Sequence, residues 1–102
     1  LAYVGAYSAT KAALIQVTKS QSIELARYNI CVNALAPGYI LTDINRDQLG
    51  GETGDLLKKK IPLKRFATVE ELDTIISMLL NTSNTYMTGA VVAVDGGLST
   101  GL

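Results

Sequence analysis

The sequence predicts an α/β fold, and three features of its 102 residues carry this prediction. A long stretch of good helix formers comes first, an almost continuously apolar run of strand length follows, and a second apolar strand comes after a capped amphipathic helix. Helix, strand, helices and strand in this order are typical of a parallel sheet with a right-handed crossover connection.

The first helix is predicted from Ala6 to about Arg27, a stretch without glycine or proline. Its apolar side chains recur at helical spacing in two overlapping stripes. They are Ala12, Ile15, Ile23 and Ala26 in one stripe, and Leu14, Val17 and Leu25 in the other. Two stripes predict a helix that is buried on more than one side, by its own sheet and by another subunit.

The first strand is predicted over Ile30–Leu35, before the dipeptide Pro37-Gly38. Its nearly continuous apolar character favours a parallel strand that is covered on both faces. Residues 39–66 are less regular and read as an excursion over the sheet edge, where a mobile lid could lie. Within this region Thr42 or Asp43 is a candidate cap for a short helix, and a second short helix is expected near residues 55–60.

A helix that starts after Thr68 is the clearest local prediction, because Thr68 and Glu71 have the spacing of a capping box. Its expected buried stripe consists of Leu72, Ile75, Ile76 and Leu79. The final strand is predicted over residues 90–94 and ends in the turn 95–97, Asp-Gly-Gly, for which we expect a role in packing or in a subunit contact.

Composition excludes several classes of protein. Nine basic and nine acidic residues cancel, so no long-range field favours nucleic acid or an anionic membrane surface. No apolar run approaches the ~20 residues that span a bilayer, and no secretory signal opens the chain. The single Cys31 rules out an internal disulfide, is expected as a small core residue, and favours a reducing, cytoplasmic location. We predict no metal site.

Tyr7 and Lys11 form the candidate catalytic pair, because residues four apart on a helix share one face. An ammonium beside a phenol favours the phenolate and lowers the Tyr pKa from about 10. Such a Tyr can act as a general acid for a carbonyl oxygen or as a general base for an alcohol. Pairs at this spacing also occur by chance, so the pair alone decides nothing.

The sequence segments that accompany this pair are more specific to one family than the pair itself. The segments "YSATKAAL", "VNALAPGYILTD" and "YMTGAVVAVDGG" together resemble the C-terminal half of the classical short-chain dehydrogenase/reductase family over essentially the whole chain. The resemblance implies a C-terminal portion of a Rossmann-type, doubly wound parallel sheet within a single domain. It also implies that Tyr7 is the catalytic acid/base and that Lys11 lowers its pKa and bonds the nicotinamide ribose.

The segment "PGYILT" looks like the one that flanks the nicotinamide in this family. By this resemblance the cofactor-binding residues are Tyr7, Lys11, Pro37, Gly38, Ile40 and Thr42, with Ile40 offering backbone groups and Thr42 its hydroxyl. The position of Pro37-Gly38 after a parallel strand agrees, since ligands of open α/β sheets bind at the carboxyl ends of strands. An ordinary turn is the alternative for Pro37-Gly38.

The family's glycine-rich phosphate loop, its NAD-or-NADP selector and its catalytic Ser belong upstream of residue 1, and no G-x-G-x-x-G pattern occurs in the chain. Two hypotheses therefore stay open. The chain is part of an NAD(P)-dependent oxidoreductase that interconverts a small-molecule alcohol and a carbonyl, or it is a truncated, inactive, self-associating fragment. Alone, it is expected to bind no cofactor.

The resemblance further implies a homo-oligomer, either a dimer or a tetramer. For the substrate it points to two types within the family, the gluconate 5-dehydrogenases and the 3-oxoacyl-acyl-carrier-protein reductases.

Overall fold

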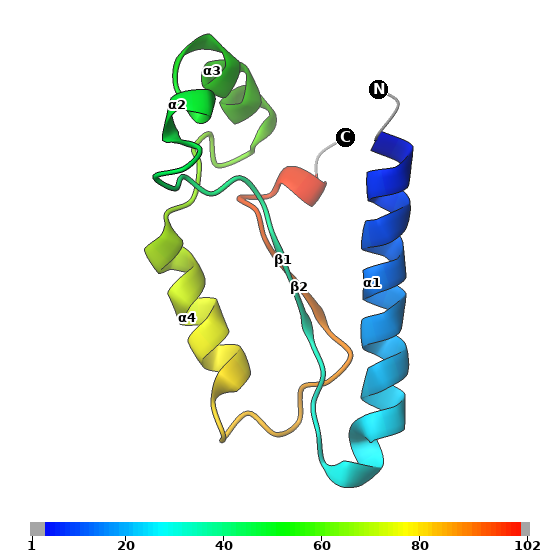
Figure 1. Ribbon diagram of the computed structural model, residues 1–102. Helices are drawn as coiled ribbons and strands as arrows, with labels where there is room; N and C mark the ends of the chain where they lie inside the picture. The colour runs from blue at the N-terminus through cyan, green and yellow to red at the C-terminus, as the bar shows by residue number, and fades with distance from the viewer. Residues whose placement is uncertain (1–3, 101–102) are drawn as a thin grey trace. The chain divides into compact units, whose positions relative to one another are not determined.

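The computed structural model describes residues 4–100, and their elements follow the predicted order (Figure 1). The elements, with η for a 3-10 helix, are α1 (Val4–Leu25), η1 (Ala26–Tyr28), β1 (Ala34–Pro37), α2 (Arg46–Leu49), α3 (Gly51–Lys60), α4 (Val69–Leu80), β2 (Val91–Val94) and η2 (Leu98–Thr100). They fall into two compact units. The first unit contains the chain up to residue 34 together with residues 82–92, and the second unit contains residues 35–81 and the chain from residue 93.

Strands β1 and β2 pair in a two-stranded sheet with parallel register. The N–H of Ala34 donates to the carbonyl of Ala90 at 2.9 Å, and the N–H of Gly38 donates to the carbonyl of Val94 at 3.0 Å. Partner numbers thus rise together along both strands, which is the parallel pattern. The α/β prediction is confirmed.

The predicted start of the first strand is wrong, because β1 begins at Ala34 and not at Ile30. Just before β1, the side chain of Asn33 bonds the neighbouring segment alongside a backbone bond from the Gly89 N–H to the Val32 carbonyl at 2.7 Å. Asn33 donates through Nδ2 to the carbonyl of Met87 at 3.0 Å and accepts the N–H of Ala90 through Oδ1 at 3.0 Å. Asn33 therefore joins the chain before β1 to residues 82–92, within the first unit, without a strand pair.

Helix α1 buries small polar side chains rather than its apolar stripes. Thr18 and Ser22, one turn apart, are 6% and 7% exposed. The hydroxyl of Thr18 donates to the carbonyl of Leu14 at 2.8 Å, which satisfies its buried oxygen. A Cβ at Gly89 would lie 2.9 Å from the Ser22 Oγ. The backbone of Gly89 approaches so closely here that only small side chains fit.

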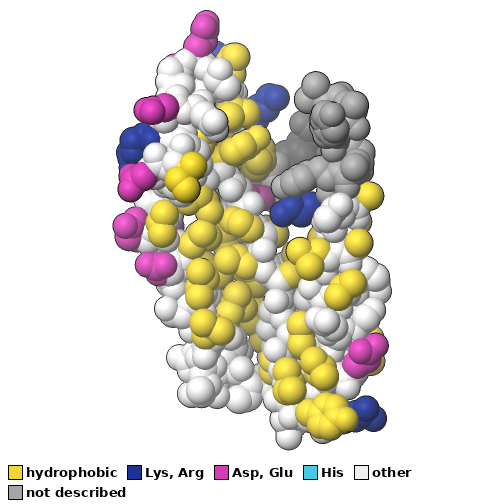
Figure 2. All heavy atoms as spheres, viewed as in Figure 1, with side chains coloured by type: hydrophobic (Ala, Val, Ile, Leu, Met, Phe, Trp, Pro, Cys, Tyr) yellow, Lys and Arg dark blue, Asp and Glu magenta, His cyan; other side chains and the backbone are white. Residues whose placement is uncertain are grey.

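The chain itself leaves much of the two stripes of α1 uncovered, although Ile15 and Leu25 are half-buried, and the predicted cover by another subunit stays a prediction. Ile23 is 78% exposed, and Leu14 and Val17 are exposed as well. Hydrophobic side chains lie open on the face of the molecule in Figure 2. Within the first unit, residues 82–92 meet α1 at Gly89, which lies against Ser22 on the face that also holds Thr18. Cys31 is also exposed, so its prediction as a core residue is wrong.

The second unit contains the buried hydrophobic side chains of the described chain, Ile61 at 2% exposure and Phe66 at 8%. The turn after β2 packs against this part of the chain. Gly96 and Gly97 have φ of 65° and 93°, and added Cβ atoms would lie 2.9 Å from Ile61 Cγ2 and from Pro62 Cγ. The predicted turn at residues 95–97 is confirmed in its packing role.

Helix α4 begins with the predicted capping box of Thr68 and Glu71. The Glu71 carboxylate accepts the N–H of Thr68 at 3.0 Å, which satisfies one of the amides that every helix start leaves unpaired. The expected buried stripe is only partly covered, since Leu72, Ile75 and Leu79 are half-buried and Ile76 is exposed.

The irregular region between β1 and α4 contains two consecutive short helices. Asn45 is the N-cap residue of α2, in place of the predicted Thr42 or Asp43. Helix α3 begins at Gly51, earlier than predicted, and a Cβ at Gly54 would overlap the carbonyl of Leu49. This overlap explains why a glycine occupies a buried helical position, where it otherwise costs stability.

Candidate functional site

The predicted catalytic pair lies on α1, in the first unit. The helical backbone includes Tyr7 and Lys11, so the two residues are one turn apart on one side of α1. Lys11 is exposed to solvent. The side chain of Tyr7 lies outside the described part of the chain, and the contact of its hydroxyl with Lys11 remains a prediction.

The predicted cofactor segment lies in the second unit, at the carboxyl end of β1. Pro37 is the last residue of β1 and is exposed. A Cβ at Gly38 would lie 2.7 Å from the Cβ and 2.8 Å from the Cα of Asp95. Gly38 lacks the positive φ that would mark a left-handed turn. Glycine is therefore needed here for the close approach of the chain after β2.

Ile40 forms an isolated parallel bridge with Ala67. Ala67 donates its N–H to the carbonyl of Tyr39 at 3.0 Å and accepts the N–H of Leu41 at 2.9 Å. In this pattern the peptide groups of the bridged residue itself face the opposite side. The N–H and the carbonyl of Ile40 therefore point away from Ala67, as a ligand contact requires.

Asn45 occupies that opposite side, and the sequence analysis missed it. Its Nδ2 donates to the Ile40 carbonyl at 2.8 Å, and its Oδ1 accepts the Thr42 N–H at 2.7 Å. The N–H of Asn45 donates to Thr42 Oγ1 at 3.3 Å. The detectable signal is Asn three residues after Thr in "TDIN", since such side chains bond to nearby backbone groups and compete with regular structure.

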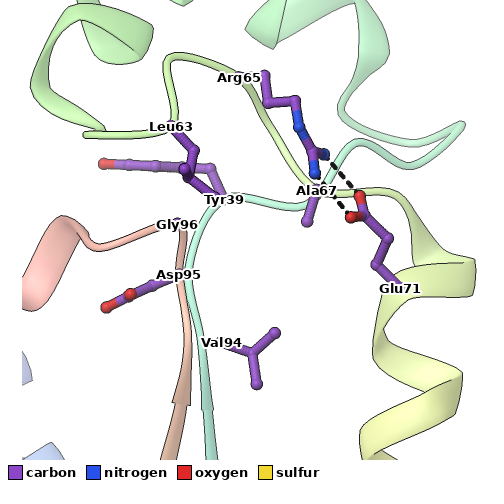
Figure 3. A pocket seen from close by; sticks show the side chains of 8 residues that line it. All are labelled: Tyr39, Leu63, Arg65, Ala67, Glu71, Val94, Asp95 and Gly96. Atoms are coloured by element: carbon purple, nitrogen blue, oxygen red, sulfur yellow. Dashed lines mark hydrogen bonds and ion pairs between the residues drawn. The ribbon is translucent and has the colours of Figure 1, made fainter.

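A pocket in the second unit lies beside this segment (Figure 3). Its lining residues are Tyr39, Leu63, Arg65, Ala67, Glu71, Val94, Asp95 and Gly96. Arg65 and Glu71 pair across it through two hydrogen bonds of 2.7 and 2.8 Å. Asp95 accepts the N–H groups of Gly97 and Ser99 at 2.9 and 3.0 Å. Its charged groups thus already have partners within the chain.

These contacts set the charge states of the pocket. The two hydrogen bonds from Arg65, and the N–H of Thr68, lower the pKa of Glu71 from 4.5 to about 2. The same pair raises the pKa of Arg65. Bonds from Ser99 and Gly97 lower the pKa of Asp95. All three groups are therefore ionised at neutral pH, and none is suited to exchange a proton there.

Residues 4–100 show neither a candidate metal site nor a bilayer-spanning helix. That stretch contains no group of three or more potential ligands of the His, Cys, Asp and Glu types that could hold a metal ion. None of its helices has both the length and the hydropathy that a bilayer-spanning helix requires.

Comparison with protein families and curated proteins identifies relatives. A family model described as enoyl-(acyl carrier protein) reductase matches residues 1–99. The 3-oxoacyl-[acyl-carrier-protein] reductase of Aquifex aeolicus is 45% identical over 92 residues, which are 90% of this chain and 37% of the relative. A ribulose-forming D-arabinitol 2-dehydrogenase of Scheffersomyces stipitis is 40% identical over 94 residues, 89% of this chain and 34% of the relative.

Solved structures with the same fold agree with these relatives. A short-chain dehydrogenase/reductase from Serratia marcescens has a TM-score of 0.84 at 34% identity, and the match covers 91% of this chain and 37% of that chain. A 4-hydroxyisoleucine dehydrogenase complexed with NADH has a TM-score of 0.86 at 27% identity, with 96% and 41% covered. The expected Rossmann-type sheet is thereby confirmed. The chain spans little more than a third of the length of these relatives, and it belongs to the short-chain dehydrogenase/reductase family of oxidoreductases.

Proposed function

We propose that these residues are the C-terminal part of the single NAD(P)-binding domain of an oxidoreductase that interconverts a small-molecule alcohol and a carbonyl. The observation that carries the proposal is the segment after β1, where the N–H and carbonyl of Ile40 are turned away from Ala67 and Thr42 lies beside them. This segment stands at the carboxyl end of a parallel strand, where open α/β sheets bind their ligands.

The donors and acceptors of this segment fit a nicotinamide carboxamide, which has one carbonyl acceptor and one NH₂ donor. Ile40 offers an N–H and the second lone pair of a carbonyl that also accepts from Asn45, and both Ile40 and Thr42 are half-buried. Thr42 Oγ1 accepts the N–H of Asn45, so its own proton is directed to another acceptor. The NADH named with one structural neighbour supports this assignment. Pro37 and Gly38 contribute by ending β1 beside it.

A bound NAD or NADP, held by Lys11, Ile40 and Thr42, would supply the hydride chemistry of the proposed reaction. The Tyr7 hydroxyl gives a proton to the carbonyl oxygen during reduction and takes it back from the alcohol during oxidation. The Lys11 ammonium stabilises the phenolate form of Tyr7 and bonds the ribose hydroxyls. The names of relatives suggest a 3-oxoacyl thioester or a polyol as the substrate class.

One measurement tests this proposal in the intact protein, meaning the whole polypeptide to which these residues belong. Purified protein is mixed with NADH or NADPH and with a panel of 3-oxoacyl thioesters and ketoses, and the loss of absorbance of the reduced cofactor is followed. We expect turnover with at least one combination of cofactor and substrate. Binding of neither cofactor by the intact protein would contradict the proposal. The isolated 102-residue chain is the control, and we expect no cofactor binding by it.

A self-associating fragment without catalysis is the second candidate, and the exposed apolar side chains of α1 favour it. The exposed side chains are Leu14, Val17 and Ile23, and burying such apolar area in an interface gains a free energy of ~25 cal/mol per Å². The same surface is expected to support the dimer or tetramer of an intact enzyme. Intact-mass analysis of the native protein separates the two, because a mass of 10.8 kDa favours the fragment and a mass near three times that value favours the enzyme.

A further inference from the structure

Asn45 makes three hydrogen bonds to the two residues that are proposed to meet the nicotinamide, while its carbonyl accepts the N–H of Leu49 at 2.9 Å. The shortest two run from its side chain, to the Thr42 N–H at 2.7 Å and to the Ile40 carbonyl at 2.8 Å. The third runs from its N–H to Thr42 Oγ1 at 3.3 Å. Asn45 itself is half-buried and lies in the same unit as its partners.

The segment is thus held from two sides. On one side Ala67 bonds the peptide groups of Tyr39 and Leu41, which flank Ile40. On the other side the Asn45 amide bonds the Ile40 carbonyl. The peptide between Ile40 and Leu41 is thus fixed from both sides, by Asn45 at its carbonyl and by Ala67 at its N–H. The preceding peptide carries the Ile40 N–H and is held through the Tyr39 carbonyl by Ala67, so the directions of both peptides are set before any ligand arrives.

Asn45 also fixes the hydroxyl of Thr42. An N–H donated to Oγ1 occupies one of its lone pairs, and the Oδ1 bond holds the Thr42 backbone from which that side chain projects. The hydroxyl proton is then free to donate in a limited range of directions. An amide carbonyl is the acceptor that suits such a donor.

We propose that Asn45 is a positioning residue that presets Ile40 and Thr42 for the carboxamide of a nicotinamide cofactor, without touching the cofactor itself. The inference rests on the proposed function. The role proposed for Asn45 does not involve the Tyr7–Lys11 pair or the pocket of Figure 3. Its distinguishing consequence is selectivity for the nicotinamide end, because the carboxamide is the part of the cofactor that Ile40 and Thr42 would hold.

The test compares two ligands in the intact protein by calorimetric titration. NADH carries the nicotinamide, and ADP-ribose is the same molecule without it; for an NADPH-preferring protein the pair is NADPH and 2′-phospho-ADP-ribose. In Asn45→Ala we expect the Kd for the reduced cofactor to rise about tenfold, the loss of one to two net hydrogen bonds. The Kd for ADP-ribose stays within about twofold, because no contact to it has changed.

Asn33→Ala is the matched control. Asn33 is also half-buried and also makes two side-chain bonds to the backbone, to Met87 and Ala90, but in the first unit. A general loss of stability would affect both variants and both ligands alike. We expect the ratio of the two Kd values to be unchanged in Asn33→Ala.

A second variant and a measurement without substitution guard against misfolding. Asn45→Asp keeps the acceptor for the Thr42 N–H and loses the donor to Ile40. The ratio of its Kd for the reduced cofactor to its Kd for ADP-ribose should therefore rise, as in Asn45→Ala. In the wild type, NADH should slow amide hydrogen exchange across residues 38–45, and ADP-ribose should not.

Equal effects on both ligands, or none, in the folded Asn45 variants would overturn the inference. Equal protection of residues 38–45 by the two ligands in the wild type would overturn it as well. A wild-type protein that binds ADP-ribose but gains nothing from the nicotinamide also contradicts it. Failure of the proposed function is a different result, in which the wild type binds neither NADH nor NADPH.

Discussion

Gly38→Ala tests the packing at the end of the sheet. The added Cβ would lie 2.7 Å from the Cβ and 2.8 Å from the Cα of Asp95, whereas carbon atoms in contact prefer ~3.5–4.0 Å. The overlap of about 1 Å is with a backbone atom, which cannot rotate away as a flexible side chain would. The ends of β1 and β2 must therefore separate.

The expected cost follows from two contributions. Overpacking of this kind costs about 1–3 kcal/mol, and weakening the bond from the Gly38 N–H to Val94, 3.0 Å long, adds up to about 1 kcal/mol. We expect the free energy of unfolding to fall by about 2–3 kcal/mol in total, which shifts a urea midpoint by about 1 M at a typical slope.

The assay is urea unfolding of the intact protein, followed by far-ultraviolet circular dichroism. Gly50→Ala is the matched control, since Gly50 has φ of −80° and its nearest obstacle, the carbonyl of Arg46, is 3.2 Å from the added Cβ. We expect that control to stay within about 0.5 kcal/mol of the wild type, as Gly-to-Ala changes do where the backbone conformation suits both. A Gly38→Ala midpoint equal to that of the control would refute the reasoning.

Three further predictions concern charge, cofactor and core. Glu71→Gln should be less stable than the wild type by its full deficit above pH 4.5, and this deficit should shrink as the pH falls toward 2. The reason is that Arg65 lowers the pKa of Glu71 to about 2, so protonation of the Glu71 carboxylate in the wild type removes its stabilising contribution. Urea midpoints of both proteins between pH 2 and 7 measure the deficit, and a deficit that does not change with pH would contradict the prediction. Lys11→Met should reduce both turnover and cofactor affinity, since one ammonium serves the phenolate and the ribose; unchanged affinity in a titration would remove the ribose role. Ile61→Ala, at a site 2% exposed in contact with Gly96, should lower the free energy of unfolding by about 2–4 kcal/mol, and a loss below 1 kcal/mol would show that the site collapses around the cavity.

Local patterns predicted the parts of the fold that depend on neighbours in the sequence. The capping box at the start of α4 requires only Thr68 and Glu71 at fixed spacing, and it is present. The order of the elements and the parallel pairing follow from the apolar runs and the crossover rule. The turn at residues 95–97 was recognisable because paired glycines permit the positive φ that the packing demands.

Features that depend on distant contacts were not predictable in the same way. The need for glycine at position 38 comes from Asp95, which lies in the turn after the other strand. The exposure of Ile23 depends on what covers α1, and helical periodicity marks a face without naming its partner. The hydrogen bond from the Asn45 side chain to the Ile40 carbonyl arises where a loop folds back on itself. Periodicity carries no information on such a bond.

Tyr7→Phe in the intact protein tests the central claim most directly, since it removes only the hydroxyl that is proposed to carry the proton. The measurements are steady-state turnover with the preferred substrate and cofactor affinity by titration, on the same preparation. We predict that turnover falls by about 10²–10⁴-fold, as expected for the loss of a general acid, while the cofactor Kd stays within a few-fold. Turnover within a few-fold of the wild type would contradict the claim.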